Sequence, residues 1–244
     1  MSLGDALRTL TRFPLPAKKL LNEERLLFWF PLVGALLGFF SWLVCLLPLP
    51  TPVRSVLVIA LGAYLTRGFH WDGLADFADG LGGGWTKERA LAIMKDSHSG
   101  AFAVITVTIT LLMQYSCLLM LVRFPLVVVL APVFGRYMQV LAASFLPYAR
   151  EGEGTASALV RGAKKRHILF PSLQMLLLLA LLALAIDHRL WLASLSSFAI
   201  SFITTLMVLH IARKRLGGVT GDVLGAVEVL SETAALLGFL LPLA

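Results

Sequence analysis

The chain has 244 residues, of which 58% are hydrophobic and only 14% are charged, and its mean hydropathy is +0.85. A soluble domain needs a far more polar surface, so these values exclude an ordinary water-soluble protein and indicate an integral membrane protein. The net charge of +7 is better explained by anionic headgroups and phosphorylated cytoplasmic substrates than by nucleic-acid binding.

Apolar segments fill most of the chain. A transmembrane helix needs about 20 mostly apolar residues. We expect six or seven such helices, at approximately residues 27–48, 53–66, 101–122, 125–146, 168–186, 190–210 and 222–243. The sequence therefore predicts an all-α, polytopic membrane protein, a bundle of six or seven transmembrane helices in one membrane-embedded domain over residues 1–244.

Charged residues are distributed unevenly between the two sides of this bundle. With the N-terminus in the cytoplasm and seven spans, 17 of the 21 Lys and Arg residues precede the first span or follow the second, fourth and sixth. The same arrangement puts 13 of the 14 Asp and Glu residues on that side or just within the membrane from it. An excess of Lys and Arg marks cytoplasmic loops. We therefore expect a polar cavity that opens to the cytoplasm.

The segment GFHWDGLADFADG, at residues 68–80, contains the first candidate site. On a helix, Asp72, Asp76 and Asp79 would lie within about 40–60° of one another, so their carboxylates would repel unless a cation lay between them. Mg²⁺ is a hard cation that takes oxygen ligands and usually brings phosphate with it. The alternative is a solvated acidic face. The glycines at 82–84 are expected to end the helix.

The segment TKERALAIMKDSHSG, at residues 86–100, is predicted to form a short amphipathic helix. Such a helix can lie on the membrane surface. Asp96, near its end, is a weaker candidate ligand for a metal or a substrate.

The last predicted helix opens with RLGGVTGDVLGAVEVLSE, at residues 215–232. Its glycines allow close approach of a ligand to the backbone, and Thr220 can cap the helix. The N–H groups that follow Gly221 would form an anion site. Short glycine runs are common and are weak evidence by themselves. The acidic residues on the same helix are what make this segment a candidate site.

Glu228 and Glu232 are four residues apart, so they share one face of that helix. An ionised carboxylate that faced lipid would cost about 2.5–3.5 kcal/mol, so both must face a protein interior or a watery cavity. Arg136, in the middle of a span, is their natural partner. It could pair with either glutamate, or its planar guanidinium could bind a substrate phosphate.

Together these motifs resemble the cobalamin synthase family. The likeness covers GFHWDGLADFADG, RALAIMKDSHSG at 89–100, GR at 135–136, YARE-G at 148–152 and the motif at 215–232. It runs from TRFP at 11–14 to the final helix, and so covers essentially the whole chain.

The resemblance implies the last joining step of adenosylcobalamin assembly. Adenosylcobinamide-GDP and α-ribazole, or its 5′-phosphate, would give adenosylcobalamin, or its 5′-phosphate, and GMP, with Mg²⁺ required. The enzyme would be a multi-pass protein of a prokaryotic cytoplasmic (inner) membrane, with its active site facing the cytoplasm.

For this reaction we expect Asp72, Asp76 and Asp79 to bind the metal, with Asp222 or Glu228 completing the site. A carboxylate free of metal, or His70, would take the proton from the ribazole hydroxyl. The candidates for phosphate binding are Lys95, Arg136, Arg150 and the helix start at Gly221.

Two other functions remain as alternatives. A CDP-alcohol phosphotransferase of phospholipid synthesis carries DG-x2-AR followed by G-x3-D-x3-D, but here Asp76 stands where Ala-Arg is needed and the downstream half is missing. A cation transporter would give ion flux without nucleotide release. The sequence leaves open a homo-oligomer, or association with other enzymes of the corrinoid pathway.

Overall fold

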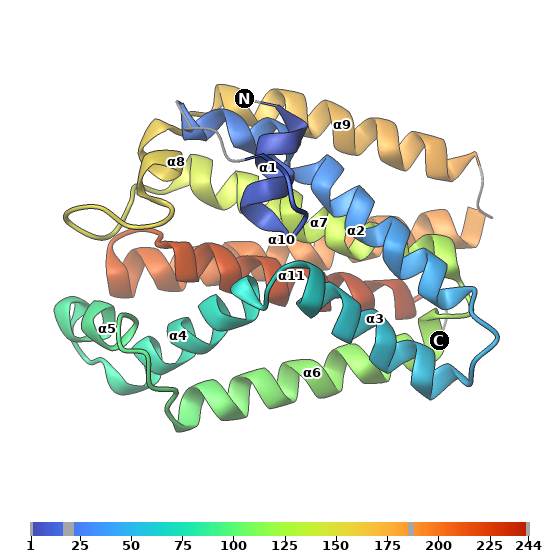
Figure 1. The fold of residues 1–244 in the computed structure, drawn as a ribbon, viewed down its shortest axis with the longest axis horizontal. Helices are drawn as coiled ribbons and strands as arrows, with labels where there is room; N and C mark the ends of the chain where they lie inside the picture. Colours follow the sequence, from blue (N-terminus) through green and yellow to red (C-terminus); the bar gives the residue numbers. More distant parts are fainter. Residues whose placement is uncertain (1, 17–21, 185–187, 243–244) are drawn as a thin grey trace.

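The structure is a computed structural model that describes residues 2–16, 22–184 and 188–242. Over these residues the chain is helical, with one isolated bridge between Tyr148 and Val219 (Figure 1). The elements are α1 (Leu3–Leu10), the 3₁₀ helix η1 (Glu23–Trp29), α2 (Phe30–Cys45), α3 (Thr51–Leu65), α4 (Phe69–Gly83), α5 (Lys87–Ile93), α6 (Ala101–Leu121), α7 (Pro125–Phe145), α8 (Ser157–Gly162), α9 (Arg166–Ala183), α10 (His188–Leu216) and α11 (Gly221–Leu240).

Five of the described helical segments are long and apolar enough to cross a membrane, and two shorter apolar helices, Thr51–Leu65 and Arg166–Leu181, accompany them. The five are Glu23–Cys45, Ala101–Leu121, Pro125–Phe145, Leu190–Leu216 and Gly221–Leu240. These segments coincide with the predicted spans, although the expected ends at 186 and 243 lie outside the described residues. The prediction of an all-α, polytopic membrane protein is therefore confirmed.

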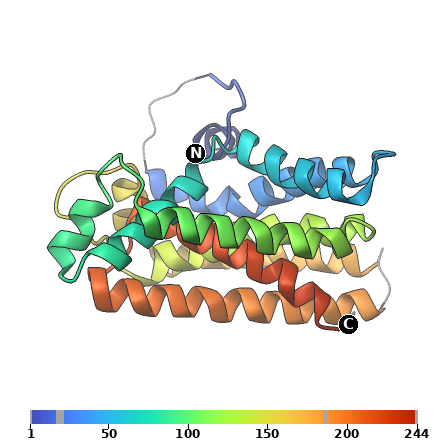
Figure 2. The same ribbon diagram turned by 90° about the horizontal axis from the view of Figure 1, so that it is seen from below.

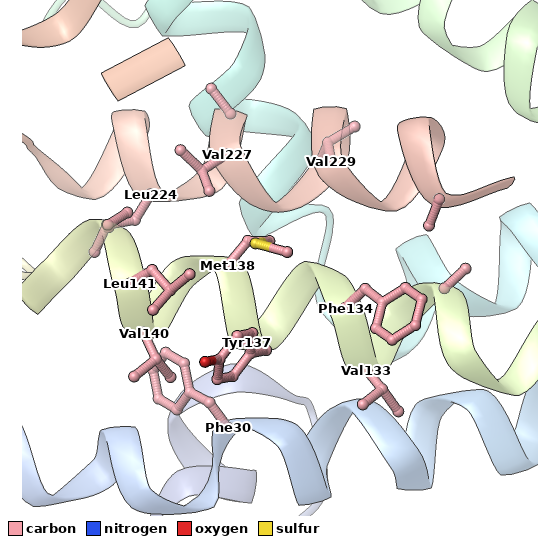
Figure 3. Packing of buried hydrophobic residues seen from close by; sticks show 14 of the residues in the cluster. Phe30, Val133, Phe134, Tyr137, Met138, Val140, Leu141, Leu224, Val227 and Val229 are labelled. Atoms are coloured by element: carbon pink, nitrogen blue, oxygen red, sulfur yellow. The ribbon is translucent and has the colours of Figure 1, made fainter. Parts of the chain in front are cut away.

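Helices α7 and α11 form the centre of the bundle. Their most apolar stretches are 89% and 78% buried, whereas that of α6 is only 28% buried, so α6 lies at the periphery (Figure 2). Figure 3 shows α7 between α11 and α2, with Met138 and Leu141 turned toward α11 and Val133 toward α2. The two central helices consequently hold their polar side chains away from lipid.

A break in the backbone separates α3 from α4. Arg67 and Gly68 adopt left-handed conformations, with φ of 60° and 67°, which a residue such as Arg67 rarely takes. The Arg67 guanidinium donates hydrogen bonds to the carbonyl oxygens of Arg8 (3.1 Å) and Thr11 (2.9 Å), and these contacts hold the turn in place. Asp72 therefore lies on a new helix, α4, which is not among the membrane spans.

Candidate active site

Helices α4 and α11 touch where each has a glycine. A Cβ atom added at Gly73 would lie 3.0 Å from the carbonyl oxygen of Asp222, and one added at Gly225 would lie 3.0 Å from that of His70. Any larger residue would push the two backbones apart. This close crossing places the acidic face of α4 beside the start of α11, at the end of the bundle that holds α5 and α8 (Figure 1).

Asp222 is held at this crossing by two side chains. Arg150 donates from Nη2 to Oδ2 of Asp222 at 2.7 Å, and the Thr220 hydroxyl donates to the same oxygen at 3.2 Å. The Thr220 hydroxyl also accepts from the N–H of Val223 at 3.3 Å, so Thr220 caps α11 as expected. Arg150 is placed by the bridge before it, where Ala149 N–H donates to the carbonyl of Val219 at 2.9 Å.

Asp76 is half-buried beside these residues. The pKa of Asp76 is raised from 3.8 to about 6, chiefly by burial and then by the negative charges of Asp72 and Asp222, against the opposing effect of Arg150. Asp72 itself is exposed and lines an open groove of about 830 Å³. Of these three carboxylates only that of Asp222 contacts Arg150, and the charges of Asp72 and Asp222 both act on Asp76. The crossing therefore carries an excess of negative charge.

This excess charge predicts how stability changes with pH. Because the folded state holds the Asp76 proton more tightly than the unfolded state, stability should fall as pH rises from about 4 to about 6 in metal-free protein. Asp76→Asn cannot ionise, so its thermal midpoint should fall less than that of the wild type over this interval. Thermal unfolding in detergent with a chelator measures both slopes. Equal slopes in the two proteins would show that Asp76 does not titrate there.

Asp79 has a different environment from the other two aspartates. It is 8% exposed, and its carboxylate accepts hydrogen bonds from the backbone N–H groups of Gly100 (2.5 Å) and Ala103 (2.9 Å). These groups belong to the start of α6, where a negative charge is favoured. Asp79 therefore caps α6 from α4, a role that the spacing of the aspartates did not indicate.

Substitutions at Asp79 can separate capping from metal binding. Asp79→Ala loses both acceptors and should cost about 1–2 kcal/mol of stability. Asp79→Asn keeps one acceptor, so it should lose less stability and retain most of its activity. Thermal unfolding and turnover are measured on both. A folded Asp79→Asn protein without turnover would instead indicate that Asp79 binds the metal.

Arg136 forms a buried ion pair with Glu228, the first of its expected alternatives. Arg136 is 1% exposed and Glu228 is 4% exposed. Together with His70 and the half-buried Glu232, they line a cavity of about 50 Å³ inside the bundle. Glu228 lies six residues beyond Asp222, about 9 Å along α11. The pair thus belongs to the interior of the bundle, away from Asp222.

His70 lies in the same interior. It is 1% exposed, its Nδ1 lies 3.9 Å from Oε2 of Glu228, and neither ring nitrogen has a hydrogen-bond partner among the described residues. A side chain so enclosed cannot reach a substrate in the groove. We therefore leave His70, Arg136 and Glu228 out of the group of residues that would contact substrate.

The two remaining candidates lie near the crossing but bond to no other candidate. Lys95 follows α5 and is exposed. Gly221 is the first residue of α11, and a Cβ atom there would lie 3.1 Å from the hydroxyl of Thr155, so the loop before α8 packs against this helix start. The sequence analysis did not identify Trp71, which lines the groove beside Asp72. Its aromatic side chain alone did not distinguish it from the other aromatic residues of the chain.

The donor set at the crossing suits a hard cation. In the described ranges, no group of three or more His, Cys, Asp or Glu residues is arranged to hold a metal ion. Mg²⁺, however, is usually bound by one or two carboxylates together with substrate phosphates. The oxygens of Asp72, Asp76 and Asp222 fit that mode of binding.

Comparison with known proteins identifies the family of the chain. A model of the cobalamin-5-phosphate synthase family matches residues 2–240. A protein named adenosylcobinamide-GDP ribazoletransferase from Prosthecochloris aestuarii is 40% identical over 94% of this chain and 93% of its own length. A protein of the same name from Chlorobium chlorochromatii is 41% identical over 95% of this chain and 92% of its own length. Another from Desulfitobacterium hafniense is 36% identical over 96% of this chain and 94% of its own length. No solved structure shows significant similarity. Since the family match spans nearly all of the chain, the protein belongs to the cobalamin-5-phosphate synthase family.

Proposed function

We propose that this protein joins adenosylcobinamide-GDP to α-ribazole, or to α-ribazole 5′-phosphate, and releases GMP. The observation that carries the proposal is the crossing of α4 and α11, where Asp222 pairs with Arg150 and where the charges of Asp72, Asp222 and Arg150 all act on Asp76. The activity agrees with the names of the relatives. It also agrees with the excess of negative charge at the crossing, which would attract a divalent cation.

Mg²⁺ is the cofactor that we propose, held by Asp72 and Asp76 with the substrate's diphosphate. When bound, it would neutralise the phosphate charge and polarise the phosphoryl group. Asp222 already accepts a hydrogen bond from Arg150, so this pair is poised to exchange partners. A diphosphate close to Arg150 would compete with Asp222 for the guanidinium, which binds phosphate oxygens through a planar fork.

The proposed reaction is a phosphoryl transfer with little covalent work for the protein. The ribazole hydroxyl oxygen forms a bond to the phosphorus on the cobinamide side, the bond from that phosphorus to the bridging oxygen breaks, and GMP leaves with the bridging oxygen. The hydroxyl proton leaves to one of the neighbouring carboxylates. The residues at the crossing would orient the diphosphate and stabilise its charge. The site is partly enclosed, and electrostatic interactions are stronger where water is excluded.

The groove beside Asp72 is the proposed entry for substrate. Its volume of about 830 Å³ lies within the usual range for ligand pockets, roughly 300–1,000 Å³. Phe69 and Trp71 line it next to Asp72, so flat apolar rings can pack against the same wall that holds the carboxylate. We propose that it opens to the cytoplasm, because the basic ends of α5, α8 and α10 surround this end of the bundle.

The test is a reaction with defined components. Purified protein is incubated with adenosylcobinamide-GDP, α-ribazole and Mg²⁺, and cobalamin and GMP are measured. Both products should appear in equal amounts, and a chelator should abolish them. If no product forms while a CDP-activated lipid releases CMP, the phospholipid reaction is correct. Ion flux into vesicles without nucleotide release would indicate a transporter.

A further inference from the structure

A second groove lies away from the acidic crossing, where η1 meets the start of α9. It has a volume of about 620 Å³ and is lined by Arg25, Phe28, Trp29, Arg166, His167 and Phe170. The Phe28 and Phe170 rings meet edge to face at a centroid distance of 5.9 Å, and Phe28 packs on His167 at 5.1 Å. The floor of this groove is therefore aromatic and built by contacts between two helices.

Both arginines at the groove are exposed. Neither guanidinium has a hydrogen bond or an ion pair with any residue that the structure describes. Glu24 forms no ion pair with either arginine. Its carboxylate lies beside Gly162, where an added Cβ would be 2.6 Å from Oε2, and its charge acts on His167. Two unpaired guanidinium groups on an aromatic floor favour an anion with an apolar part.

His167 adds a third polar group. The backbone N–H of Lys164 donates to Nδ1 of His167 at 2.9 Å. The neutral ring must therefore carry its proton on Nε2, which makes His167 a hydrogen-bond donor on its other side.

The position of the groove identifies the anion. Arg25 and Arg166 stand at the starts of two apolar segments, Glu23–Cys45 and Arg166–Leu181, which is the level of lipid headgroups. Below Phe170, α9 exposes Leu169, Leu173 and Leu176, each more than half exposed. Trp and Phe rings near such a boundary and arginines above it suit a headgroup with acyl chains beneath. A soluble phosphate would make no use of the leucine face.

We propose that this groove binds the phosphate headgroup of one anionic phospholipid, with its acyl chains along α9. The two arginines hold the phosphate through charge-assisted hydrogen bonds, and the aromatic rings cover the glycerol region. This assignment does not depend on the proposed reaction, because none of the residues lies at the crossing of α4 and α11.

The experiment uses the full chain in nanodiscs that contain equal amounts of phosphatidylglycerol and phosphatidylcholine. Native mass spectrometry counts the lipids that the released protein retains. The wild type should retain one phosphatidylglycerol in preference to phosphatidylcholine. The variant Arg25→Gln/Arg166→Gln should reduce that occupancy by about tenfold, which corresponds to about 1.4 kcal/mol. Because both side chains are exposed, the variant should elute as a folded protein in gel filtration.

A matched control is Arg213→Gln/Lys214→Gln, which removes two exposed charges from the end of α10. It should leave the retained phosphatidylglycerol unchanged. Equal losses in the two variants would overturn the proposal, because they would show only general attraction to positive charge. Displacement of the lipid by inorganic phosphate alone would also overturn it, since the groove would then bind a free anion. Arg25→Lys/Arg166→Lys, which keeps the charge but not the fork, should show an intermediate loss.

Discussion

Asp76→Asn should lower turnover by about 10²–10³-fold or more while the protein remains folded. Asparagine has nearly the same shape as aspartate, but it lacks the negative charge with which Asp76 would bind the metal ion. The substitution also relieves repulsion from Asp72 and Asp222, so it should not lower the thermal midpoint in metal-free protein. Cobalamin and GMP formation measure the first effect, and thermal unfolding in detergent measures the second.

The matched control for Asp76 is Glu88→Gln, which removes an exposed carboxylate from the neighbouring helix α5. It should keep wild-type turnover. Near-normal turnover in folded Asp76→Asn would remove Asp76 from the site. It would leave the family assignment intact and shift the metal-binding proposal to Asp72 and Asp222.

Glu228→Leu should be among the most destabilising substitutions in the chain. It leaves the guanidinium of Arg136, which is 1% exposed, without the carboxylate that it now contacts. Breaking a buried pair in this way costs about 3–5 kcal/mol, and the nearby Glu232 would offset part of that cost. The expected result is a large drop in the thermal midpoint of the purified protein in detergent, or its loss from the membrane fraction.

A double substitution shows whether the stability lost in Glu228→Leu comes from the unpaired charge of Arg136. Arg136→Met/Glu228→Leu replaces the pair with apolar residues, which is often neutral for stability when the volumes match. It should recover much of the midpoint that Glu228→Leu loses, although Glu232 then lacks its nearby positive charge. Equal midpoints for the single and double variants would show that the cost comes from packing. Wild-type stability in Glu228→Leu would show that the pair is not needed for folding.

The sequence by itself determined the membrane class and the helices. Long apolar runs can cross a bilayer only as hydrogen-bonded helices or as closed barrels, so hydropathy and length together located all seven apolar segments. Where the structure describes their ends, these differ from the predicted ones by up to six residues, as at Leu216. The motifs also led directly to the family, because several polar patterns in a fixed order are far more specific than any one of them. The cost of an unpaired charge in lipid predicted an anionic partner for Arg136, either a glutamate or a substrate phosphate, and the structure shows Glu228.

The roles of individual acidic residues were decided only by tertiary structure. Helical spacing put Asp79 on the same face as Asp72 and Asp76, but spacing cannot show that α6 begins beside Asp79 and uses its carboxylate as a cap. Likewise, Asp222 and Glu228 looked equivalent as ligands along one helix. The glycine contact between α4 and α11 is the reason that we include Asp222 and not Glu228 in the proposed site, because it brings the start of α11 beside the acidic helix. Side-chain roles at helix crossings depend on long-range contacts, which local periodicity does not contain.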